Sequence, residues 1–375
     1  MPTRRTIPLI NEHELQPRNG TPGHSISLSD LPPPEKPKKP WYYRLPLVGT
    51  IGFILAPQPS ILWVLVHHHL QTLKKTHIFL IHLVVIYTLN LMIMASLYVC
   101  VTRDPGPVTL EPNQQEDYAG DDDEDVGLTE ALMSGGGEDD FMKPGRWCRT
   151  CWAPKPERAH HCSVCDRCVL KMDHHCPWLG ATCIGHRTYP AFVHFLTCIT
   201  ILAIYITTIC VNAVIWSFRN PFEVINPVTP IHEFAVVVYG GMFAVVIGPF
   251  AAYHYYLIST NQTTLENISP FMLLRHLPPL PRSGHGLSDP PLEPELSYHQ
   301  RRAVKDAHGK VYMYDVGWKK NWAQVFGWDT RRGWIERILY GGASPGDGRY
   351  FPRNPRSEAM LANLASELVK LDRNA

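Results

Sequence analysis

The residues best suited to chemistry are seven cysteines and four histidines that lie between Cys148 and Cys183. Two C-x-x-C pairs, Cys148 with Cys151 and Cys162 with Cys165, have the spacing with which one tight turn offers two sulfurs to a tetrahedral ion. Two closed zinc sites need about eight ligands. Three of these eleven side chains should therefore stay outside the metal shells, and the stretch predicts two structural zinc ions beside a separate reactive group.

The segment Asp173-His174-His175-Cys176 places a cysteine beside two imidazoles and a carboxylate. One imidazole can bind zinc while the other accepts the thiol proton, and Asp173 can orient that ring and stabilise its charged form. An imidazolium beside Cys176 would also raise the thiolate fraction at neutral pH. The segment thus predicts a cysteine nucleophile on a metal-stapled domain. Metal ligation without catalysis is the simpler alternative, because most zinc modules bind proteins or nucleic acid.

The elements that must position this cluster are membrane helices. Four long stretches contain no Asp, Glu, Lys or Arg, namely 45–66, 78–101, 191–218 and 234–258. A bilayer core about 30 Å thick needs roughly 20 apolar residues in a helix. We therefore expect an α-helical integral membrane protein with four transmembrane helices and a cysteine-rich double-zinc domain between helices two and three. Pro57 and Pro59 interrupt the first stretch and predict a kink.

Charge and composition set the orientation and the partners. The formal net charge is only +1, so no global basic surface indicates nucleic acid. Basic residues are frequent before the first span and between the second and third, whereas the other two connections carry only Lys74, Lys75 and Arg219. We expect both termini and the cysteine-rich domain to be cytosolic. In that reducing compartment cysteines bind metal more often than they form disulfides. The Pro-rich start of the chain is not a secretory signal by composition.

The chain is expected to contain six parts, and their contents follow from composition. They are a disordered arm at 1–40, spans one and two at 41–101, a connecting segment with an acidic linker at 102–147, the cysteine-rich domain at 148–190, spans three and four at 191–258, and a cytosolic tail at 259–375. In the tail, the Pro-rich stretch 276–297 could be a ligand for a small recognition domain, but we expect it to be a spacer. Leucines recur at helical spacing between Leu361 and Leu371 and face either a partner or the body of the protein. The run from His67 to His69 could bind metal, but we expect it to form a solvated loop.

Residues 148–189 resemble the cysteine-rich domain of the DHHC family of protein S-acyltransferases, which takes its name from the four residues that begin at Asp173. The order KPERAHHCSVCDRCVLKMDHHCPW is close to the family pattern. Three further segments resemble family motifs: Asp104-Pro105-Gly106 its DPG motif, Thr263-Thr264-Leu265-Glu266 its TTxE motif, and the surroundings of Asn321 its short C-terminal aromatic-Asn motif. The resemblance covers most of residues 41–328.

The resemblance implies two interleaved sets of zinc ligands. One set would be Cys148, Cys151, His161 and Cys168, and the other Cys162, Cys165, His175 and Cys183. The residues alone do not distinguish His161 from His160, or His175 from His174. One departure concerns Cys183, because the segment PWLGAT that follows Cys176 is one residue longer than the usual family spacing.

The resemblance also implies a two-step transfer of a long acyl chain, with Cys176 as the acyl carrier between coenzyme A and protein cysteines. His174 would accept the thiol proton and Asp173 would orient His174. The acyl donor would be a long-chain acyl-CoA such as palmitoyl-CoA. Its acyl chain would lie among the four spans, and its coenzyme A head would lie near Lys155 and Arg158. Partners would be proteins with accessible cysteines and the lipid bilayer, and not nucleic acid. The CPWLGATC segment is similar to that of the fungal vacuolar branch, which implies a vacuole or Golgi membrane.

Two other classes of protein compete with this interpretation. A membrane-anchored zinc adaptor, similar to a ubiquitin ligase scaffold, would explain the metal ligands and would form no covalent intermediate. A transporter would use the polar residues inside the spans, His82, Asn90 and His194, as a relay. Labelling of the chain by an acyl donor separates these two classes from an acyltransferase.

Overall fold

The computed structural model describes residues 40–108, 147–148, 150–151, 153–223, 226–281, 284–328 and 333–373. The chain divides into two compact units, Met1–Trp41 and Tyr42–Ala375. The disordered arm expected at 1–40 lies outside the described residues except for its last residue. The acidic linker also lies outside them.

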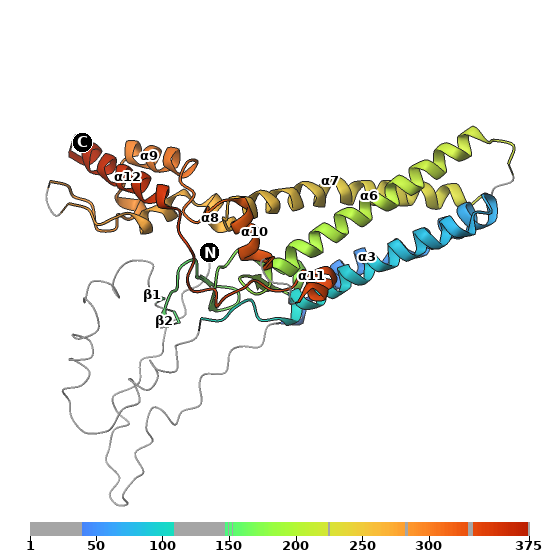
Figure 1. Ribbon diagram of the computed structural model, residues 1–375, viewed down its shortest axis with the longest axis horizontal. Helices are drawn as coiled ribbons and strands as arrows, with labels where there is room; N and C mark the ends of the chain where they lie inside the picture. The colour runs from blue at the N-terminus through green and yellow to red at the C-terminus, as the bar shows by residue number, and fades with distance from the viewer. Residues whose placement is uncertain are drawn as a thin grey trace, which may run out of the picture. The chain divides into compact units, whose positions relative to one another are not determined.

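Four helical segments in the described part of the chain are long and apolar enough to cross a membrane. They are Trp41–Thr72, Thr76–Thr102 (α3), Tyr189–Arg219 (α6) and Thr229–Ser259 (α7). These helices run alongside one another (Figure 1). All four predicted stretches lie inside them, which confirms the expected helical membrane architecture.

The first span is made of several short helices. In order, these are the 3₁₀ turn η3 (Trp41–Arg44), α1 (Leu45–Leu55), α2 (Gln58–Val64) and the π-helix η4 (Leu65–Thr72). The turn between α1 and α2 contains Pro57, whose ring removes a backbone N–H from the helical ladder. The interruption therefore lies where the sequence predicts a kink.

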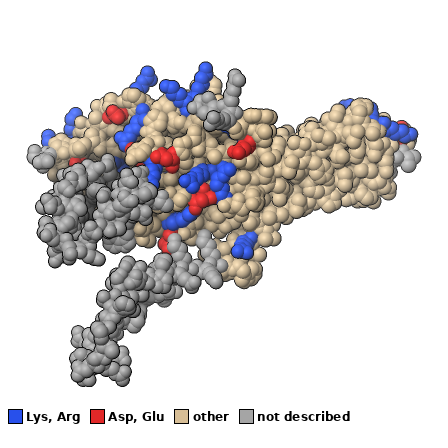
Figure 2. Space-filling model, turned by 60° about the horizontal axis from the view of Figure 1, so that its bottom comes forward, with Lys and Arg blue, Asp and Glu red and all other residues tan. Residues whose placement is uncertain are grey.

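The outer surface of the bundle is apolar, as a lipid-facing surface requires. Val84, Val238 and Val245 are each more than 60% exposed. A helix that is apolar all round is typical of a membrane span. Figure 2 shows charged side chains gathered toward the two ends of the bundle, with a long uncharged stretch between them.

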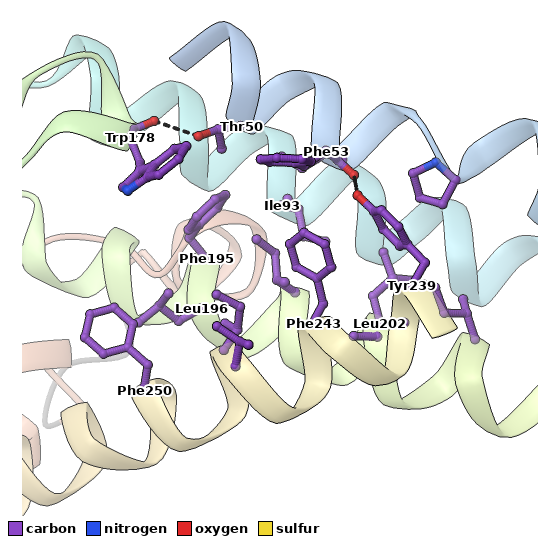
Figure 3. A pocket seen from close by; sticks show the side chains of 18 of the residues that line it. Thr50, Phe53, Ile93, Trp178, Phe195, Leu196, Leu202, Tyr239, Phe243 and Phe250 are labelled. Atoms are coloured by element: carbon purple, nitrogen blue, oxygen red, sulfur yellow. Dashed lines mark hydrogen bonds between the residues drawn. The ribbon is translucent and has the colours of Figure 1, made fainter. Parts of the chain in front are cut away.

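The spans pack closely around an apolar cavity of about 370 Å³. Gly240 of α7 allows the closest approach, because a Cβ there would lie 2.4 Å from Thr207 Oγ1 of α6. Helices from all four spans contribute to the cavity wall, for instance through Phe53, Ile93 and Phe243 (Figure 3). The bundle therefore encloses a space that suits an apolar ligand.

The cysteine-rich region consists of three antiparallel hairpins between α3 and α6. The strand pairs are β1 (Trp147–Cys148) with β2 (Ala153–Pro154), β3 (His160–Cys162) with β4 (Arg167–Val169), and β5 (His174–Cys176) with β6 (Thr182–Ile184). A 3₁₀ turn, η5 (Pro177–Leu179), lies inside the third hairpin. Strands of two or three residues bury little apolar surface, so this region needs other support.

The segment Asp104-Pro105-Gly106 attaches this region to the end of α3. The Leu170 N–H donates to the Gly106 carbonyl at 2.8 Å, and Arg167 forms an ion pair with Asp104 at 2.7 Å. Gly106 has φ +117°, a conformation that favours glycine. The DPG-like segment thus has a structural role, since it docks the second hairpin on the bundle.

After α7 the chain forms a set of short helices and one longer helix. They are α8 (Thr264–Ile268), η6 (Pro270–His276), η7 (Glu293–Glu295), α9 (Tyr298–His308), α10 (Trp318–Phe326), α11 (Trp334–Tyr340) and α12 (Pro355–Arg373). Helices α9 and α12 lie side by side (Figure 1). Leu361, Leu364 and Leu368 of α12 are buried in a second apolar cluster. The leucine repeat therefore packs on the body of the protein.

The Pro-rich stretch 276–297 is not a spacer, contrary to the expectation from its composition. Four of its leucines are buried in the same second cluster, namely Leu277, Leu280, Leu287 and Leu296. Composition alone predicts an extended segment, but apolar side chains placed between the prolines gain by burial. The stretch is a packed part of the C-terminal region.

Candidate active site

Strand alternation divides the residues of β5 between two faces. Successive side chains of a strand point in opposite directions. His174 and Cys176 therefore share one face of β5, while His175 lies on the other face. The geometry of the strand alone therefore separates His175 from the pair formed by His174 and Cys176.

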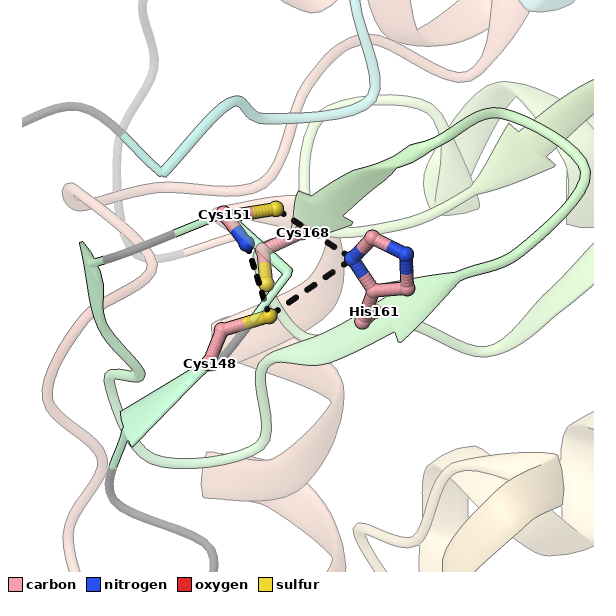
Figure 4. A group of neighbouring side chains, drawn as sticks. All are labelled: Cys148, Cys151, His161 and Cys168. Carbon is pink, nitrogen blue, oxygen red and sulfur yellow. Dashed lines mark hydrogen bonds between the residues drawn. The ribbon is translucent and has the colours of Figure 1, made fainter. Parts of the chain in front are cut away.

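Two groups of side chains in the described part of the chain bring their ligand atoms within 4.8 Å of one another. They are Cys148, Cys151, His161 and Cys168 (Figure 4), and Cys162, Cys165, His175 and Cys183. In β3, His161 is paired with Cys168 across the hairpin, whereas the next residue, Cys162, points to the opposite face. This alternation explains why two groups interleaved in sequence are separate in space.

The distances within each group suit a tetrahedral zinc ion. His161 Nδ1 lies 3.6 Å from Cys148 Sγ and 3.2 Å from Cys151 Sγ. In the second group, His175 Nδ1 lies 3.4 Å from Cys165 Sγ. Nitrogen and sulfur donors bound to one zinc ion lie about 3.5 Å apart. The two clusters could hold zinc, and its role there is to join the hairpins.

The longer spacing before Cys183 does not remove this residue from the second group. Cys183 Sγ lies 3.6 Å from Cys165 Sγ and 3.8 Å from His175 Nδ1. The connection contains two consecutive residues with positive φ, Gly180 at 81° and Ala181 at 52°. The extra residue is therefore absorbed in the turn after η5, and Cys183 stays opposite His175 in the third hairpin.

Cys176 belongs to neither metal group and lies next to a polarised histidine. His174 Nδ1 is 2.7 Å from Asp173 Oδ2. Burial lowers the pKa of His174, but the hydrogen bond to Asp173 and the interaction with the neighbouring Cys176 sulfur outweigh burial and raise this pKa to about 9. The imidazole can therefore take and hold a proton from the thiol.

Asp173 is held in place from the other side by the TTxE-like segment. Thr264 donates to both carboxylate oxygens, from its N–H to Oδ1 at 2.8 Å and from its hydroxyl to Oδ2 at 2.8 Å. Asp173 is only 1% exposed. Burial favours the neutral acid, yet the bonds to His174 and Thr264 keep the Asp173 pKa below its usual value. A charged, oriented carboxylate is what a histidine base needs.

The apolar cavity opens beside the nucleophile. Cys176 and Trp178 both line it, and the Trp178 carbonyl accepts a bond of 2.9 Å from the Thr50 hydroxyl of α1. In Figure 3, Trp178 and Tyr239 lie toward opposite ends of the labelled side chains. The Tyr239 hydroxyl donates to the Phe53 carbonyl and ties α7 to α1. The cavity thus leads from a sulfur into the membrane-spanning bundle.

Residues 142–270 match the family model described as DHHC palmitoyltransferase. This chain carries a DHHC domain. The geometry of the two metal groups and the free Cys176 agrees with that assignment, and the DHHC domain contains the cysteine-rich region, α6, α7 and α8.

Curated relatives come from animals, fungi and plants. Palmitoyltransferase ZDHHC15 of Rattus norvegicus is 34% identical over 222 residues, which is 59% of this chain and 54% of that protein. Palmitoyltransferase pfa3 of Emericella nidulans is 43% identical over 128 residues, 32% of this chain and 23% of that protein. Probable protein S-acyltransferase 3 of Arabidopsis thaliana is 32% identical over 197 residues, 48% of this chain and 46% of that protein. This chain spans about half the length of ZDHHC15 and of S-acyltransferase 3, and about a quarter of the length of pfa3.

Arg158 of the DHHC domain lies inside the protein, which differs from the expected contact with coenzyme A. Its guanidinium binds both carboxylate oxygens of Glu266, at 2.7 and 2.8 Å, and it donates to the Asn261 side chain at 3.0 Å. The side chain is 1% exposed. Because its donors are used internally, the placement of Arg158 does not suit an acyl-CoA site. Lys155 is half-buried and stays a candidate.

Glu266 also completes a capping box at the start of α8. The Thr263 hydroxyl accepts from the Glu266 N–H at 3.2 Å, and the Glu266 carboxylate accepts from the Thr263 N–H at 2.9 Å. The four residues of the TTxE-like segment thus place Thr264 against Asp173 and Glu266 against Arg158. The motif is a clamp between α8 and the DHHC cysteine-rich region.

Asn321 anchors the C-terminal motif on the end of α7. It is fully buried and donates to the Ser259 carbonyl at 2.7 Å, while its side-chain oxygen accepts from the Val316 N–H. Trp322 donates to the Ser259 hydroxyl at 3.1 Å. This motif has a structural role beside the DHHC domain.

The sequence missed several residues that complete the site. Asn261 binds Arg158 and has φ +49°, a conformation in which asparagine is enriched. The rings of Tyr314 and Phe351 lie 4.2 and 4.9 Å from the Arg158 guanidinium. Tyr314 begins the segment that contains the C-terminal aromatic-Asn motif, whereas Phe351 had no motif or spacing that could have marked it.

The polar residues of the transporter alternative are separated from one another. His82 bonds to Tyr205 at 2.8 Å, Asn90 to Gln58 at 2.9 Å, and His194 to a serine of α3 at 2.6 Å. Each therefore has its own local partner, which is the arrangement of structural bonds between helices and not of a relay.

Proposed function

We propose that this chain is a protein S-acyltransferase that carries a long acyl group on Cys176. In the first step the Cys176 thiolate attacks the carbonyl carbon of a long-chain acyl-CoA such as palmitoyl-CoA. A bond forms between this carbon and Cys176 Sγ, and the bond to the coenzyme A sulfur breaks. The thiol proton passes to His174, whose Nδ1 is held by Asp173, and then to the departing sulfur.

The second step passes the acyl group to a cysteine of a protein substrate. The substrate thiol gives its proton to His174, its sulfur attacks the acyl-Cys176 carbonyl, and Cys176 leaves and recovers a proton. One thioester breaks and one forms in each step, so the free energy changes little along the sequence. The acyl chain would lie in the cavity, where burial contributes about 0.8 kcal/mol per methylene.

One observation carries the proposal: Cys176 stands outside both metal groups, lies beside His174 and lines an apolar cavity. A zinc adaptor needs none of these three features. Zinc would be structural, held by the eight residues of the two groups, and the coenzyme A head would lie near Lys155. Substrates would be proteins with accessible cysteines at or near the membrane surface.

The proposed orientation places both termini and the DHHC domain in the cytosol, because these segments together carry nearly all of the basic residues, whereas the other two connections carry only Lys74, Lys75 and Arg219. Acyl-CoA would then reach Cys176 from the cytosol. A vacuole or Golgi membrane is proposed from the resemblance of the CPWLGATC segment to the fungal vacuolar branch. Fluorescence microscopy of a tagged chain, with protease protection of each terminus, tests both statements.

The chemical test is acylation of the purified chain by a labelled palmitoyl donor. We expect hydroxylamine-sensitive label on the parent and none on Cys176→Ser. Cys198→Ala is a matched control, since Cys198 is a buried thiol of α6 outside the cavity wall, and it should keep the label. Label that persists in Cys176→Ser would remove the assigned nucleophile, and a parent without label would favour the adaptor.

A further inference from the structure

The histidine run at the far end of the first span is not the solvated loop that its sequence suggests. It lies in the π-helix η4, where His68 and His69 are 2% and 8% exposed. The Leu73 N–H donates to the His68 carbonyl at 2.9 Å, with the five-residue spacing of a π-helix. Such helices are rare and occur often at functional sites. The unusual turn directs two imidazoles into the bundle.

A buried carboxylate faces these histidines. Glu233 of α7 is fully buried, and its Oε1 lies 3.6 Å from His68 Nδ1. This distance is too long for a hydrogen bond. Neither oxygen of Glu233 has a hydrogen-bond partner, and His68 Nδ1 has none either. A buried carboxylate in this state is costly unless a cation satisfies it.

Further unsatisfied atoms surround the pair. Both ring nitrogens of His69 are buried without a hydrogen-bond partner, and its ring centroid lies 5.0 Å from that of His68. The hydroxyl of Thr229, one helical turn before Glu233, is buried and unpaired as well. Buried polar atoms nearly always have partners, so a group of them at one place calls for a bound ion or water.

We propose that His68, His69 and Glu233 form a third metal site, which binds Zn²⁺. Nitrogen and oxygen donors on one tetrahedral zinc ion lie about 3.4 Å apart, close to the 3.6 Å between His68 and Glu233. The Cys148 to His161 distance in the first cysteine group is also 3.6 Å. The ring nitrogens of His69 do not meet the 4.8 Å separation found in the two cysteine groups, so His69 must rotate toward the ion to become the third ligand. A bound water takes the fourth position.

This site is separate from the proposed acyl transfer. Figure 1 shows the hairpin that joins η4 to α3 at the opposite end of the bundle from β1 and β2. The ion would join span one to span four there, as a structural staple. Its three protein ligands are nitrogen and oxygen donors, a set that zinc accepts readily.

The test is the zinc content of the full-length protein purified in detergent and equilibrated with buffered free zinc. We expect about three zinc ions per chain for the parent and about two for Glu233→Gln, a change that keeps the side-chain volume. His68→Asn is a second variant with the same expected loss. His77→Ala, an exposed histidine at the start of α3, is the matched control and should keep about three ions.

A thermal melt gives a second readout that does not depend on acylation. Added zinc should raise the melting temperature of the parent but not that of Glu233→Gln, because only the parent gains a ligand at this site. A parent that binds about two ions, or a Glu233→Gln variant that binds as many as the parent, would show that the cluster holds no metal.

Discussion

The cysteine-rich region and the C-terminal region both lie at the same end of the bundle, but they are stabilised in different ways. The buried apolar cluster of the cysteine-rich region has four residues, and two of them, Cys162 and Cys183, belong to a metal group. The C-terminal region buries a cluster of fifteen residues between η6, α9 and α12. A region with so small a core would rely on metal bound at its two ligand groups, whereas apolar burial suffices for the other.

The two regions meet at the residues that position the proposed nucleophile. Arg158 of the cysteine-rich region binds Glu266 and lies over the ring of Tyr314. In the same TTxE-like segment, the Thr264 N–H donates to the Asp173 carboxylate and holds it in place. The metal-dependent region therefore carries the reactive groups, and the apolar region holds them in place. Each half of this comparison can be tested separately.

Removal of a metal ligand should have the largest effect. We expect Cys165→Ala to lose one zinc ion, unfold the second and third hairpins and abolish acyl labelling, because three ligands cannot replace the missing core. The helices of the C-terminal region should persist. Zinc analysis, labelling and hydrogen exchange measure these three outcomes. Retained labelling in a zinc-depleted variant would show that the hairpins fold without metal.

The junction between the regions should come next. Glu266→Gln leaves the Arg158 guanidinium buried without its ion-pair partner, a change that costs about 3–5 kcal/mol. We expect a lower melting temperature and weaker labelling with unchanged zinc content. Arg353→Ala removes a more exposed ion pair with Glu157 and serves as the control with little effect. Equal effects of both changes would argue against the clamp.

The apolar region should respond to a cavity without losing metal. Leu368 of α12 is fully buried, so Leu368→Ala should destabilise the C-terminal cluster by about 2–5 kcal/mol. Met360→Ala, on the exposed side of α12, should change stability little. Denaturant unfolding, monitored by susceptibility to proteolysis, measures the difference in stability between the two variants. Loss of zinc from Leu368→Ala would mean that the cysteine-rich region depends on this core as well.

Features with a local signal could be predicted from the sequence. The four spans follow from uncharged stretches, and the metal groups follow from C-x-x-C spacing together with a family resemblance. Spacing does not distinguish His175 from His174 as the zinc ligand, although strand alternation in a short extended segment separates the two. The order His174-His175-Cys176 places His175 on the face opposite Cys176 once the segment is assumed to be a strand.

Features that depend on distant partners could not be predicted. Arg158 is an ordinary surface arginine by sequence, and its burial depends on Glu266, which lies 108 residues along the chain. The Pro-rich stretch 276–297 is packed because α12 supplies the other side of its core. The run that contains His68 is buried because Glu233 and α7 cover it. In each case the deciding residue is remote in sequence.

The last prediction concerns a lysine at the boundary between the two regions. Burial lowers the pKa of Lys171 to about 7, with a further contribution from Arg158, and its ammonium lies 5.2 Å from the Phe351 ring. The folded protein thus binds fewer protons than the unfolded chain between pH 7 and about 10.5, so this lysine destabilises the fold less as the pH rises. Lys171→Met should therefore be more stable than the parent near pH 7, and the advantage should shrink by pH 10. A stability difference that stays constant across this range would show that Lys171 is solvated, and that the boundary between the two regions is wet.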